Sequence, residues 1–400
     1  MTGYDLLIVG AGPAGSFAAE LLAEHGAKVA LFDGRPEGEP KACGGGVTAK
    51  ALKAWPQLLN AVGRTINELD LYSPSSKRLH LHLDEPFAIY SRIAFDCYLR
   101  ERARDAGAHV IANKISARKT KRIDNGWRLS AHDGSEWTGA LLIGADGANS
   151  GIAKLLAGPL PPSDMEVAFG YRAPLPANGE AATVVAFLPG WVGYAWAFPR
   201  PDHISFGIAT TQDAFEHDPL DDLLWRFMIG YYQQCEGAEV NFWRAEDDSV
   251  RTDIHERLRA TAERYAARIP GLSATTWDKR KVCGDNWALL GDAAGFADPV
   301  TGEGIYYALR SAELLAESYL SGKPLSYEER WREDFGVELR RASQMRRRFY
   351  GNFWGAPFTE RMIEFARGHR GVKRVLGNLV AGEQGYVDLK KKLVKSALRP

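Results

Sequence analysis

The sequence predicts an α/β protein that begins with a Rossmann-like fold, carries an inserted antiparallel β-sheet and ends in helices. Three observations support this prediction. The first 33 residues run through an apolar strand, a glycine-rich turn, a helix and a second strand. Two later strands end in turns that pair glycine with aspartate, near residues 146 and 292. Between residues 165 and 280 apolar and polar residues alternate, as in strands with one buried face.

The composition fits a globular protein of about two or three domains. The chain has 400 residues, 45% hydrophobic and 25% charged, and it lacks the roughly 18 consecutive apolar residues of a membrane-spanning helix. A strand begins within the first residues, so we expect no signal peptide and a cytoplasmic protein. The four cysteines are far apart and form no CxxC pair, so neither a disulfide framework nor a metal site is expected.

The glycine-rich turn is the strongest local signal, and it is typical of a dinucleotide-binding site. Its first glycine permits a tight turn, its second lets the backbone approach a pyrophosphate, and its third lets the helix pack closely on the strand. The helix N-terminus adds N–H groups and a positive dipole. The expected contacts are Gly10, Gly12, Pro13, Ala14 and Gly15.

Acidic residues at strand ends continue this pattern along the chain. Asp33 ends the second strand, where a carboxylate accepts hydrogen bonds from an adenosine ribose. Arg35, two residues on, either reaches the adenosine end or is a solvated loop residue. Two later turns also pair glycine with an acidic residue, and the second of them leads into a long amphipathic helix. Three such turns in one chain are more than a site for NAD alone would need. They supply the candidates Asp146, Gly147, Gly291, Asp292, Gly302, Glu303, Gly304 and Ile305.

Together these turns resemble FAD-dependent oxidoreductases of the glutathione-reductase-like class, which includes the aromatic hydroxylases. In that class the second Gly-Asp, here at residue 292, contacts the ribityl chain, and the intermediate Asp-Gly lies near the pyrophosphate. The resemblance therefore implies FAD as the cofactor. Arg92, which starts a helix, matches an arginine that the class points at FAD, although a surface salt bridge is the alternative. Ile115 is also included among the expected FAD contacts.

Four further segments resemble the geranylgeranyl reductase family: "KACGGGV", "YSRIAFDCYL", "GYAWAFPR" and "TGEGIYYAL". Members of this family reduce carbon–carbon double bonds in prenyl chains of chlorophyll precursors, archaeal-type lipids or quinones. The resemblance implies hydride transfer from reduced flavin N5 to such a chain, with NADPH or a reduced ferredoxin-like protein as the electron donor. A flavin monooxygenase (hydroxylase) or halogenase is the alternative, and a flavoprotein that only carries electrons is a third.

Cys43 and the glycines after it are expected at the flavin. Gly44 and Gly45 would let the backbone reach the ring system, where a side chain would collide. Cys43 is the candidate catalytic residue, which would shape the apolar pocket or deliver a proton, but a small buried residue that fills space is the alternative. We expect Lys41, just before it, to be a solvent-exposed loop residue.

The aromatic residues of "GYAWAFPR" alternate along a predicted strand, so they share one face. This face is either the floor of a tunnel for a prenyl chain or ordinary sheet core. The substrate-binding candidates are Tyr194, Trp196, Phe198 and Pro199.

These segments divide the chain into a discontinuous FAD-binding domain, a substrate domain and a helical tail. The predicted FAD-binding domain comprises residues 1–70, 92–165 and 280–325. The antiparallel substrate domain comprises residues 70–91 and 165–280, and residues 326–400 form the C-terminal helical region.

The C-terminal region is basic although the whole chain has no net charge. Residues 339–400 carry 15 lysines and arginines against 4 acidic residues. The region also contains Phe349, Tyr350, Phe353, Trp354 and Phe358. Such a segment is either a structural cover or a peripheral contact with an anionic membrane. Nothing else in the chain suggests contact with nucleic acid.

Overall fold

The computed structural model describes residues 3–36, 38, 41–177, 180–211, 220–244, 252–353 and 355–397. These residues form two compact units, each with its own sheet of eight strands. Unit 1 comprises residues 1–41, 92–165 and 269–343, and unit 2 comprises residues 42–91, 166–268 and 344–400. The mixed α/β class predicted from the sequence is confirmed.

The sheet of unit 1 contains five parallel strands in the order β16-β9-β1-β2-β6. Three of them end at the turns that the sequence singled out, so those turns share one edge of the sheet. Antiparallel strands extend the sheet at β15 and through β8 to β7. The strands are β1 (Gly3–Val9), β2 (Val29–Phe32), β6 (His109–Ile111), β7 (Lys121–Ile123), β8 (Gly126–Ser130), β9 (Glu136–Gly144), β15 (Cys283–Gly284) and β16 (Trp287–Leu289).

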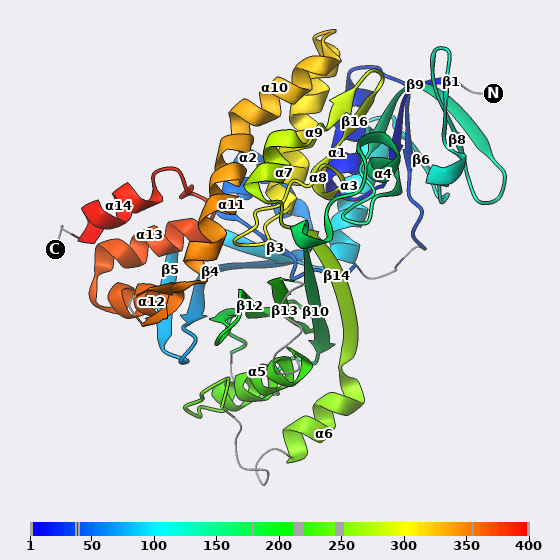
Figure 1. The fold of residues 1–400 in the computed structure, drawn as a ribbon. Coiled ribbons are helices and arrows are strands. Elements are labelled where there is room, and N and C mark those ends of the chain that lie inside the picture. Colours follow the sequence, from blue (N-terminus) through cyan, green and yellow to red (C-terminus); the bar gives the residue numbers. More distant parts are fainter. Residues whose placement is uncertain are drawn as a thin grey trace. The chain divides into compact units, whose positions relative to one another are not determined.

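Helix α1 of unit 1 packs against both α3 and α9, and α9 lies beside α1 in Figure 1. Its small residues Ala14 and Ala18 are buried, and they allow close packing. The helices of this unit are α1 (Pro13–Glu24), α3 (Arg92–Asp105), α4 (Gly151–Ala157), α7 (Ala274–Lys279), α8 (Gly291–Ala294), α9 (Ile305–Leu320) and α10 (Tyr327–Trp331). Helix α11 (Val337–Phe349) runs from the residues of unit 1 into those of unit 2.

The sheet of unit 2 has the strand order β14-β10-β13-β12-β11-β4-β5-β3. Its strands pair antiparallel from β10 to β11, and β11 then pairs in parallel with β4. The strands are β3 (Gly46–Val47), β4 (Gly63–Tyr72), β5 (Arg78–Tyr90), β10 (Met165–Ala173), β11 (Val184–Phe187), β12 (Gly193–Pro199), β13 (Ile204–Thr211) and β14 (Glu263–Pro270).

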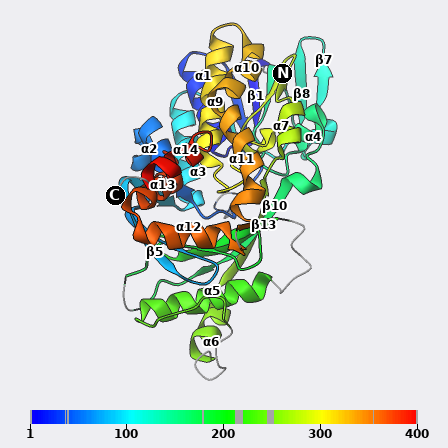
Figure 2. The same ribbon diagram turned by 60° about the vertical axis from the view of Figure 1, so that its left-hand side comes forward.

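Helices cover both faces of the unit 2 sheet. Helix α5 (Leu220–Cys235) packs on β12 and β13, whereas α2 (Ala49–Ala54), α12 (Phe358–Gly368) and α13 (Arg370–Val380) contact β5. Figure 2 shows α5 below the strands and α12 above them. Helix α5 was not predicted from the sequence, yet its apolar residues form a large core with Ala195, Ala197 and Phe206. The remaining elements are α6 (Thr252–Thr261), α14 (Leu389–Ala397) and the short pair β17 (Asn352–Phe353) and β18 (Ala356–Pro357).

The two units differ in their bounds from the predicted domains. Residues 42–70 were assigned to the FAD-binding domain, but they lie in unit 2 because β3 and β4 both pair with β5. Residues 344–400 also belong to unit 2, where α12 and α13 pack on β5. The functional division into FAD-binding and substrate domains stays a prediction.

The aromatic residues of the C-terminal region are used in packing within unit 2. Phe349 is 5% exposed, and its ring contacts Phe187, Tyr350 and Phe358. Trp354 and the side chain of Phe353 lie outside the described residues. Among the residues that the structure describes, no helix combines the length and the apolar character needed to cross a lipid bilayer.

Candidate functional site

The glycine-rich turn of unit 1 requires glycine at two positions for steric reasons. Gly10 has a φ of +108°, and a Cβ there would lie 2.3 Å from the carbonyl oxygen of Ala145. A Cβ on Gly15 would lie 1.9 Å from the carbonyl oxygen of Gly10. In contrast, apart from its chain neighbours, no described residue has an atom within 4 Å of a Cβ built on Gly12, the residue just before Pro13 and α1. The turn is therefore tightly packed at Gly10 and unobstructed at Gly12, so a phosphate group can approach the backbone at Gly12.

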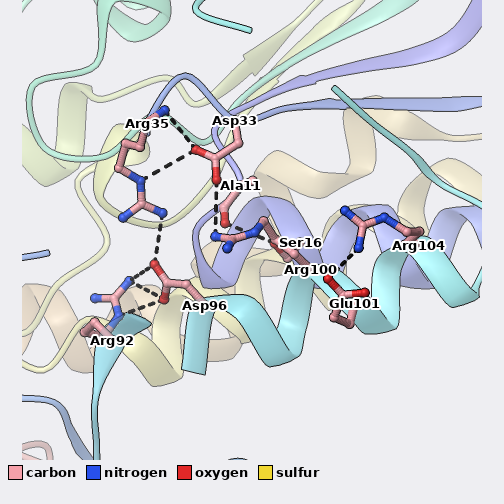
Figure 3. A network of polar contacts seen from close by, with 9 residues as sticks. All are labelled: Ala11, Ser16, Asp33, Arg35, Arg92, Asp96, Arg100, Glu101 and Arg104. Carbon is pink, nitrogen blue, oxygen red and sulfur yellow. Dashed lines mark hydrogen bonds and ion pairs between the residues drawn. The ribbon is translucent and has the colours of Figure 1, made fainter. Parts of the chain in front are cut away.

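A chain of charged side chains follows the end of β2 (Figure 3). The carboxylate of Asp33 lies 3.2 Å from Nη1 of Arg100 and accepts a 3.2 Å hydrogen bond from the backbone N–H of Arg35. The Arg35 guanidinium donates at 3.1 Å to Asp96, which also accepts two bonds from Arg92, at 2.8 and 3.0 Å. Asp33 and Arg92, both predicted to bind FAD, are thus connected through Arg35 and Asp96.

Arg92 is not at the surface, so the surface salt bridge that the sequence allowed does not occur. Its side chain is 5% exposed and pairs with Asp96 one helical turn away. Burial alone would raise the pKa of Asp96, but the positive charges of Arg92 and Lys41 hold this pKa below its usual value. Asp96 therefore stays ionised and fixes Arg92 at the start of α3. The i,i+4 spacing of Arg92 and Asp96 in "YSRIAFDCYL" is the sequence signal that could have indicated this pair.

Asp146, at the end of β9, uses its carboxylate to begin a helix. It accepts hydrogen bonds from the backbone N–H groups of Gly151 and Ile152 at 2.8 and 3.2 Å, and from the hydroxyl of Ser150. The two N–H groups belong to the first turn of α4, where backbone donors have no partner within the helix. The Asp146 carboxylate is thus occupied within the protein, and Gly147 follows it with open space around a Cβ position.

The Gly291-Asp292 turn lies where α1, α8 and α9 converge. A Cβ on Gly291 would come within 3.2 Å of Ala308 and 3.3 Å of Ala14. The Asp292 side chain is partly buried, and within the described parts of the chain its carboxylate has no hydrogen-bond partner. Burial raises the pKa of Asp292, although the positive charges of Lys41 and Arg92 oppose this rise. Hydroxyl donors from a ligand would satisfy such a carboxylate.

The loop before α9 is closed by its own backbone and by Asp298. The carboxylate of Asp298 accepts bonds from the N–H groups of Val300 and Thr301 at 2.7 and 3.2 Å. Its backbone N–H donates to the Glu303 carbonyl, and its carbonyl accepts from the Gly302 N–H, both at 2.8 Å. A Cβ on Gly304 would lie 3.1 Å from Asp292. The predicted contacts from Gly302 to Ile305 are therefore held next to Asp292.

Lys41 is half-buried, so the prediction of a solvent-exposed residue was wrong. Arg92 first, and burial second, lower the pKa of its ammonium group, whereas Asp96 and Asp292 oppose this shift. Lys41 thus adds a cation to the group formed by Arg92, Asp96 and Asp292. No pattern in the sequence indicated this, because the contacts join distant segments.

Ile115 lies in the segment between β6 and β7. It forms an isolated bridge with Ala131, and its neighbour Lys114 packs within 3.2 Å of a Cβ position on Gly34, next to Asp33. Its segment therefore runs beside the end of β2.

The Cys43 loop belongs to unit 2, where its glycines pack against aromatic rings. A Cβ on Gly44 would lie 3.2 Å from Phe198, and one on Gly46 would lie 2.7 Å from Phe87. Gly45 has a φ of +80°, and its Cβ would collide with the carbonyl oxygen of Tyr90 at 2.1 Å. These contacts explain the glycines without a ligand, and approach to a flavin stays a prediction.

The aromatic residues of β12 share one face, as predicted. The rings of Tyr194 and Trp196 have centroids 6.0 Å apart, and those of Trp196 and Phe198 are 6.4 Å apart. The intervening Ala195 and Ala197 point to the opposite face and join the core with α5. Trp196 lies over Gly207 of β13, because a Cβ there would come within 2.0 Å of its indole. Pro199 ends the strand and is buried.

The aromatic face is thus separate from the α5 core, and two of its rings remain partly accessible. Tyr194 and Phe198 are half-buried, whereas Trp196 is 5% exposed. Phe198 continues the aromatic surface to Phe87, with ring centroids 6.2 Å apart. Such a surface can hold an extended apolar chain.

The residues of unit 1 fit a dinucleotide with a hydroxylated chain. Gly12 leaves the start of α1 open, and Asp292 is a partly buried acceptor without a donor among the described residues. Lys41 and Arg92 supply positive charge near that carboxylate. These features match the pyrophosphate and the ribityl hydroxyls of FAD in chemical character.

Comparison with known proteins supports this match. Residues 3–319 match a family model described as an FAD binding domain. The chain is 27% identical over 345 residues to a chloroplast geranylgeranyl diphosphate reductase of Nicotiana tabacum, a match that covers 80% of this chain. It covers 66% of the tobacco protein, so the chain spans just under two thirds of that relative's length.

Two further comparisons cover a larger share of the matched protein. The chain is 30% identical over 342 residues to digeranylgeranylglycerophospholipid reductase 2 of Methanosphaera stadtmanae, covering 77% of this chain and 75% of that protein. A crystal structure from Thermoplasma acidophilum, described as geranylgeranyl bacteriochlorophyll reductase-like, matches 99% of this chain and 100% of its own. Its TM-score is 0.74 at 22% identity, so this likeness concerns the fold.

We predict that Asp292→Ala weakens retention of FAD. A carboxylate that accepts from ribityl hydroxyls contributes a hydrogen bond of the charged class, so its loss should weaken binding by about tenfold to a hundredfold. The measurement is the ratio of flavin to protein absorbance after gel filtration, followed by titration of the stripped protein with FAD. Asp278→Ala, which removes an exposed carboxylate paired with Arg340, is the matched control. Equal affinity in Asp292→Ala and Asp278→Ala would show that Asp292 does not hold the cofactor.

Proposed function

Because the chain belongs to the FAD binding domain family and, within it, to the geranylgeranyl reductases, we propose that it is an FAD-dependent reductase of carbon–carbon double bonds in a geranylgeranyl (prenyl) chain. The substrate is a lipid, a chlorophyll-type molecule or a quinone. The observation that carries this proposal is the aromatic face of β12 beside the Cys43 loop. An extended hydrocarbon chain has no polar group for recognition, so a continuous apolar surface must hold it.

In this proposal the cofactor is held by the residues predicted to bind it, most of which lie in unit 1. The N-terminus of α1 takes the pyrophosphate, Asp33 takes the adenosine ribose, and Asp292 takes the ribityl chain. The N–H groups at the start of α9 favour negative charge on the cofactor. The full set is Gly10, Gly12, Pro13, Ala14, Gly15, Asp33, Arg35, Cys43, Gly44, Gly45, Arg92, Ile115, Asp146, Gly147, Gly291, Asp292, Gly302, Glu303, Gly304 and Ile305.

Saturating a double bond requires a hydride on one carbon and a proton on its neighbour. Bound FAD, once reduced, supplies the hydride from N5. Tyr194, Trp196, Phe198 and Pro199 position the prenyl chain and exclude water from it. Cys43 donates the proton or shapes the pocket in which it arrives, because its thiol is partly accessible and lies in the loop packed on Phe198.

The reducing equivalents come from NADPH or from a reduced ferredoxin-like protein. The chain contains one glycine fingerprint of the Gly10–Gly15 type. A second nucleotide would therefore dock transiently rather than in a second Rossmann site.

The proposed activity is tested by mixing anaerobically reduced protein with a geranylgeranyl compound. We expect the flavin absorbance to return without oxygen, together with a product heavier by two hydrogens for each reduced bond. Geranylgeraniol analogues with all bonds saturated are the matched control and should leave the flavin reduced. Reoxidation only after oxygen is admitted, with a hydroxylated or halogenated product, would establish a monooxygenase or halogenase instead. Prior reduction with NADPH and with a reduced ferredoxin, compared side by side, identifies the donor.

For Cys43 we predict that replacement by alanine leaves FAD content and flavin reduction nearly unchanged. Alkene reduction should slow by about tenfold, the effect of losing about 1.4 kcal/mol of transition-state stabilisation, or fewer bonds should be reduced per chain. Stopped-flow reoxidation and mass analysis of the products measure both effects. Cys97→Ala removes an exposed cysteine of α3 and serves as the control. An unchanged rate and product pattern would leave Cys43 as a residue that only fills space.

We further propose that the basic C-terminal region makes peripheral contact with anionic membranes. The support is the exposed surface of α14, which carries Lys390, Lys391, Lys392 and Lys395 next to Val394, 54% exposed. A cavity of about 730 Å³ lies between α13 and α14, lined by Lys392, Lys395, Arg370 and Arg374 on its cationic side. Because Phe349 is buried, the lysines rather than the tail's aromatic residues carry this proposal.

We predict that the protein sediments with vesicles that contain phosphatidylglycerol at low salt and is released at high salt. Each basic residue near an anionic surface adds about 1 kcal/mol, and salt screens this attraction. Changing Lys390, Lys391, Lys392 and Lys395 to Glu should abolish sedimentation. The same change at the exposed residues Arg118, Lys119, Lys121 and Arg122 is the control and should preserve it. Equal sedimentation with phosphatidylcholine vesicles, or none with anionic ones, would mean that the region is a structural cover.

A further inference from the structure

Arg200 is a buried cation that the sequence analysis did not assign to any site. It follows Pro199 at the end of β12, in the turn that leads to β13, where its backbone N–H donates to the His203 carbonyl at 2.7 Å. The residue is 4% exposed. Burying a guanidinium is costly unless acceptors replace its water. The identity of those acceptors therefore indicates what Arg200 does.

Two of these acceptors are backbone carbonyls of the Cys43 loop, and Nη1 of Arg200 also lies 3.5 Å from Nε2 of His203. Nη2 of Arg200 donates to the carbonyl oxygen of Cys43 at 2.8 Å and to that of Gly44 at 3.1 Å. The guanidinium occupies the space that Gly45 leaves, because a Cβ there would lie 2.9 Å from Nη2. The N–H of Gly45 in turn donates to Sγ of Cys43 at 3.3 Å. Arg200 thus holds the Cys43–Gly44 and Gly44–Gly45 peptide groups in place. The second of these peptide groups supplies the N–H that donates to the Cys43 thiol.

A second contact, from an uncharged side chain, reaches the carbonyl oxygen of Cys43. Oγ of Ser205 lies 3.5 Å from the Cys43 oxygen and 2.9 Å from the Tyr265 hydroxyl, which donates to the Phe206 carbonyl at 2.6 Å. Burial raises the pKa of Tyr265 to about 12, so its hydroxyl keeps its proton at neutral pH. The Cys43 carbonyl is therefore held by Arg200 from the turn after β12 and by Ser205 from β13.

We propose that Arg200 is a positioning residue for the reduction, which orients the Cys43 thiol by binding the carbonyl oxygens of Cys43 and Gly44. The effect of Arg200 on catalysis rests on the proposed function. Its effect on the orientation of Cys43 is independent of that function. Arginine suits the task because its planar guanidinium presents several fixed donors and never loses its charge, whereas a lysine ammonium presents one mobile centre. Ser205 adds a weaker second restraint.

The first experiment measures the chemical reactivity of Cys43 in the FAD-loaded protein. Alkylation by iodoacetamide is followed at residue 43 by peptide mass spectrometry for the parent, Arg200→Met and Arg200→Lys. Loss of the two carbonyl contacts should free the loop, so we expect alkylation of Cys43 about threefold faster or more in Arg200→Met. Arg200→Lys, which keeps the charge, should lie between Arg200→Met and the parent. Tyr231→Phe removes a buried bond to the Ala182 carbonyl elsewhere in unit 2 and should match the parent.

The second experiment measures turnover of the geranylgeranyl compound by the same variants. In Arg200→Met we expect kcat to fall about tenfold with KM changed less than about twofold, because the prenyl-binding face of β12 is intact. FAD content should equal that of the parent, and Arg200→Lys should recover part of kcat.

The two experiments separate the inference from the proposed function. Parental rates of Cys43 alkylation and of turnover in Arg200→Met would overturn the positioning role. Faster alkylation in Arg200→Met, with no turnover by any form including the parent, would support the orientation of Cys43 and refute the reductase activity. If Arg200→Met does not fold, Arg200→Lys and Ser205→Ala take its place. Both should then alkylate faster than Tyr231→Phe, and parental rates in both would overturn the role.

Discussion

The backbone contact among Gly10, Gly15 and Ala145 is the constraint on which unit 1 depends. It presses the start of α1 against the ends of β1 and β9, with no room for a side chain between them. Because β2 and β16 run parallel to these strands, their carboxyl ends reach the same edge. Asp33, Asp146 and Asp292 follow those ends, so one steric contact sets the frame in which three distant acidic residues are placed.

Unit 2 also depends on a close approach of the backbone, but to a different kind of neighbour. There the close approach is made by the loop after Cys43, and what it approaches is an aromatic strand and a buried guanidinium rather than another strand end. The glycines are thus required by packing that already exists without any ligand. Rigid support of this kind is what a reacting group needs, since small displacements of such a group are costly for the reaction.

Local patterns predicted much of the fold, and tertiary contacts decided the rest. Helix α1, the strand that ends at Gly144 and helix α9 follow directly from periodicity and turn residues. Helix α5 does not follow from the sequence pattern, which indicates only strands over residues 165–280, and residues 42–70 lie in unit 2 because β3 and β4 pair with β5. For the candidate site, Asp33, Arg92 and Asp292 could be named from their motifs, although no contact could. The capping role of Asp146, the burial of Lys41 and the bonds of Arg200 each depend on segments far apart in the chain.

The division of the chain between the two units has a consequence for how the protein is made. The backbone crosses between the units five times, after residues 41, 91, 165, 268 and 343. During synthesis β1 and β2 emerge first, but β16, which completes the parallel sheet beside β9, emerges some 250 residues later. Strand β5 is likewise made long before α12 and α13, the helices near the end of the chain that pack on it. Neither unit can close before the last third of the chain has left the ribosome, so half-made chains expose an open edge of the unit 1 sheet and an uncovered face of the unit 2 sheet, and they depend on protection from aggregation.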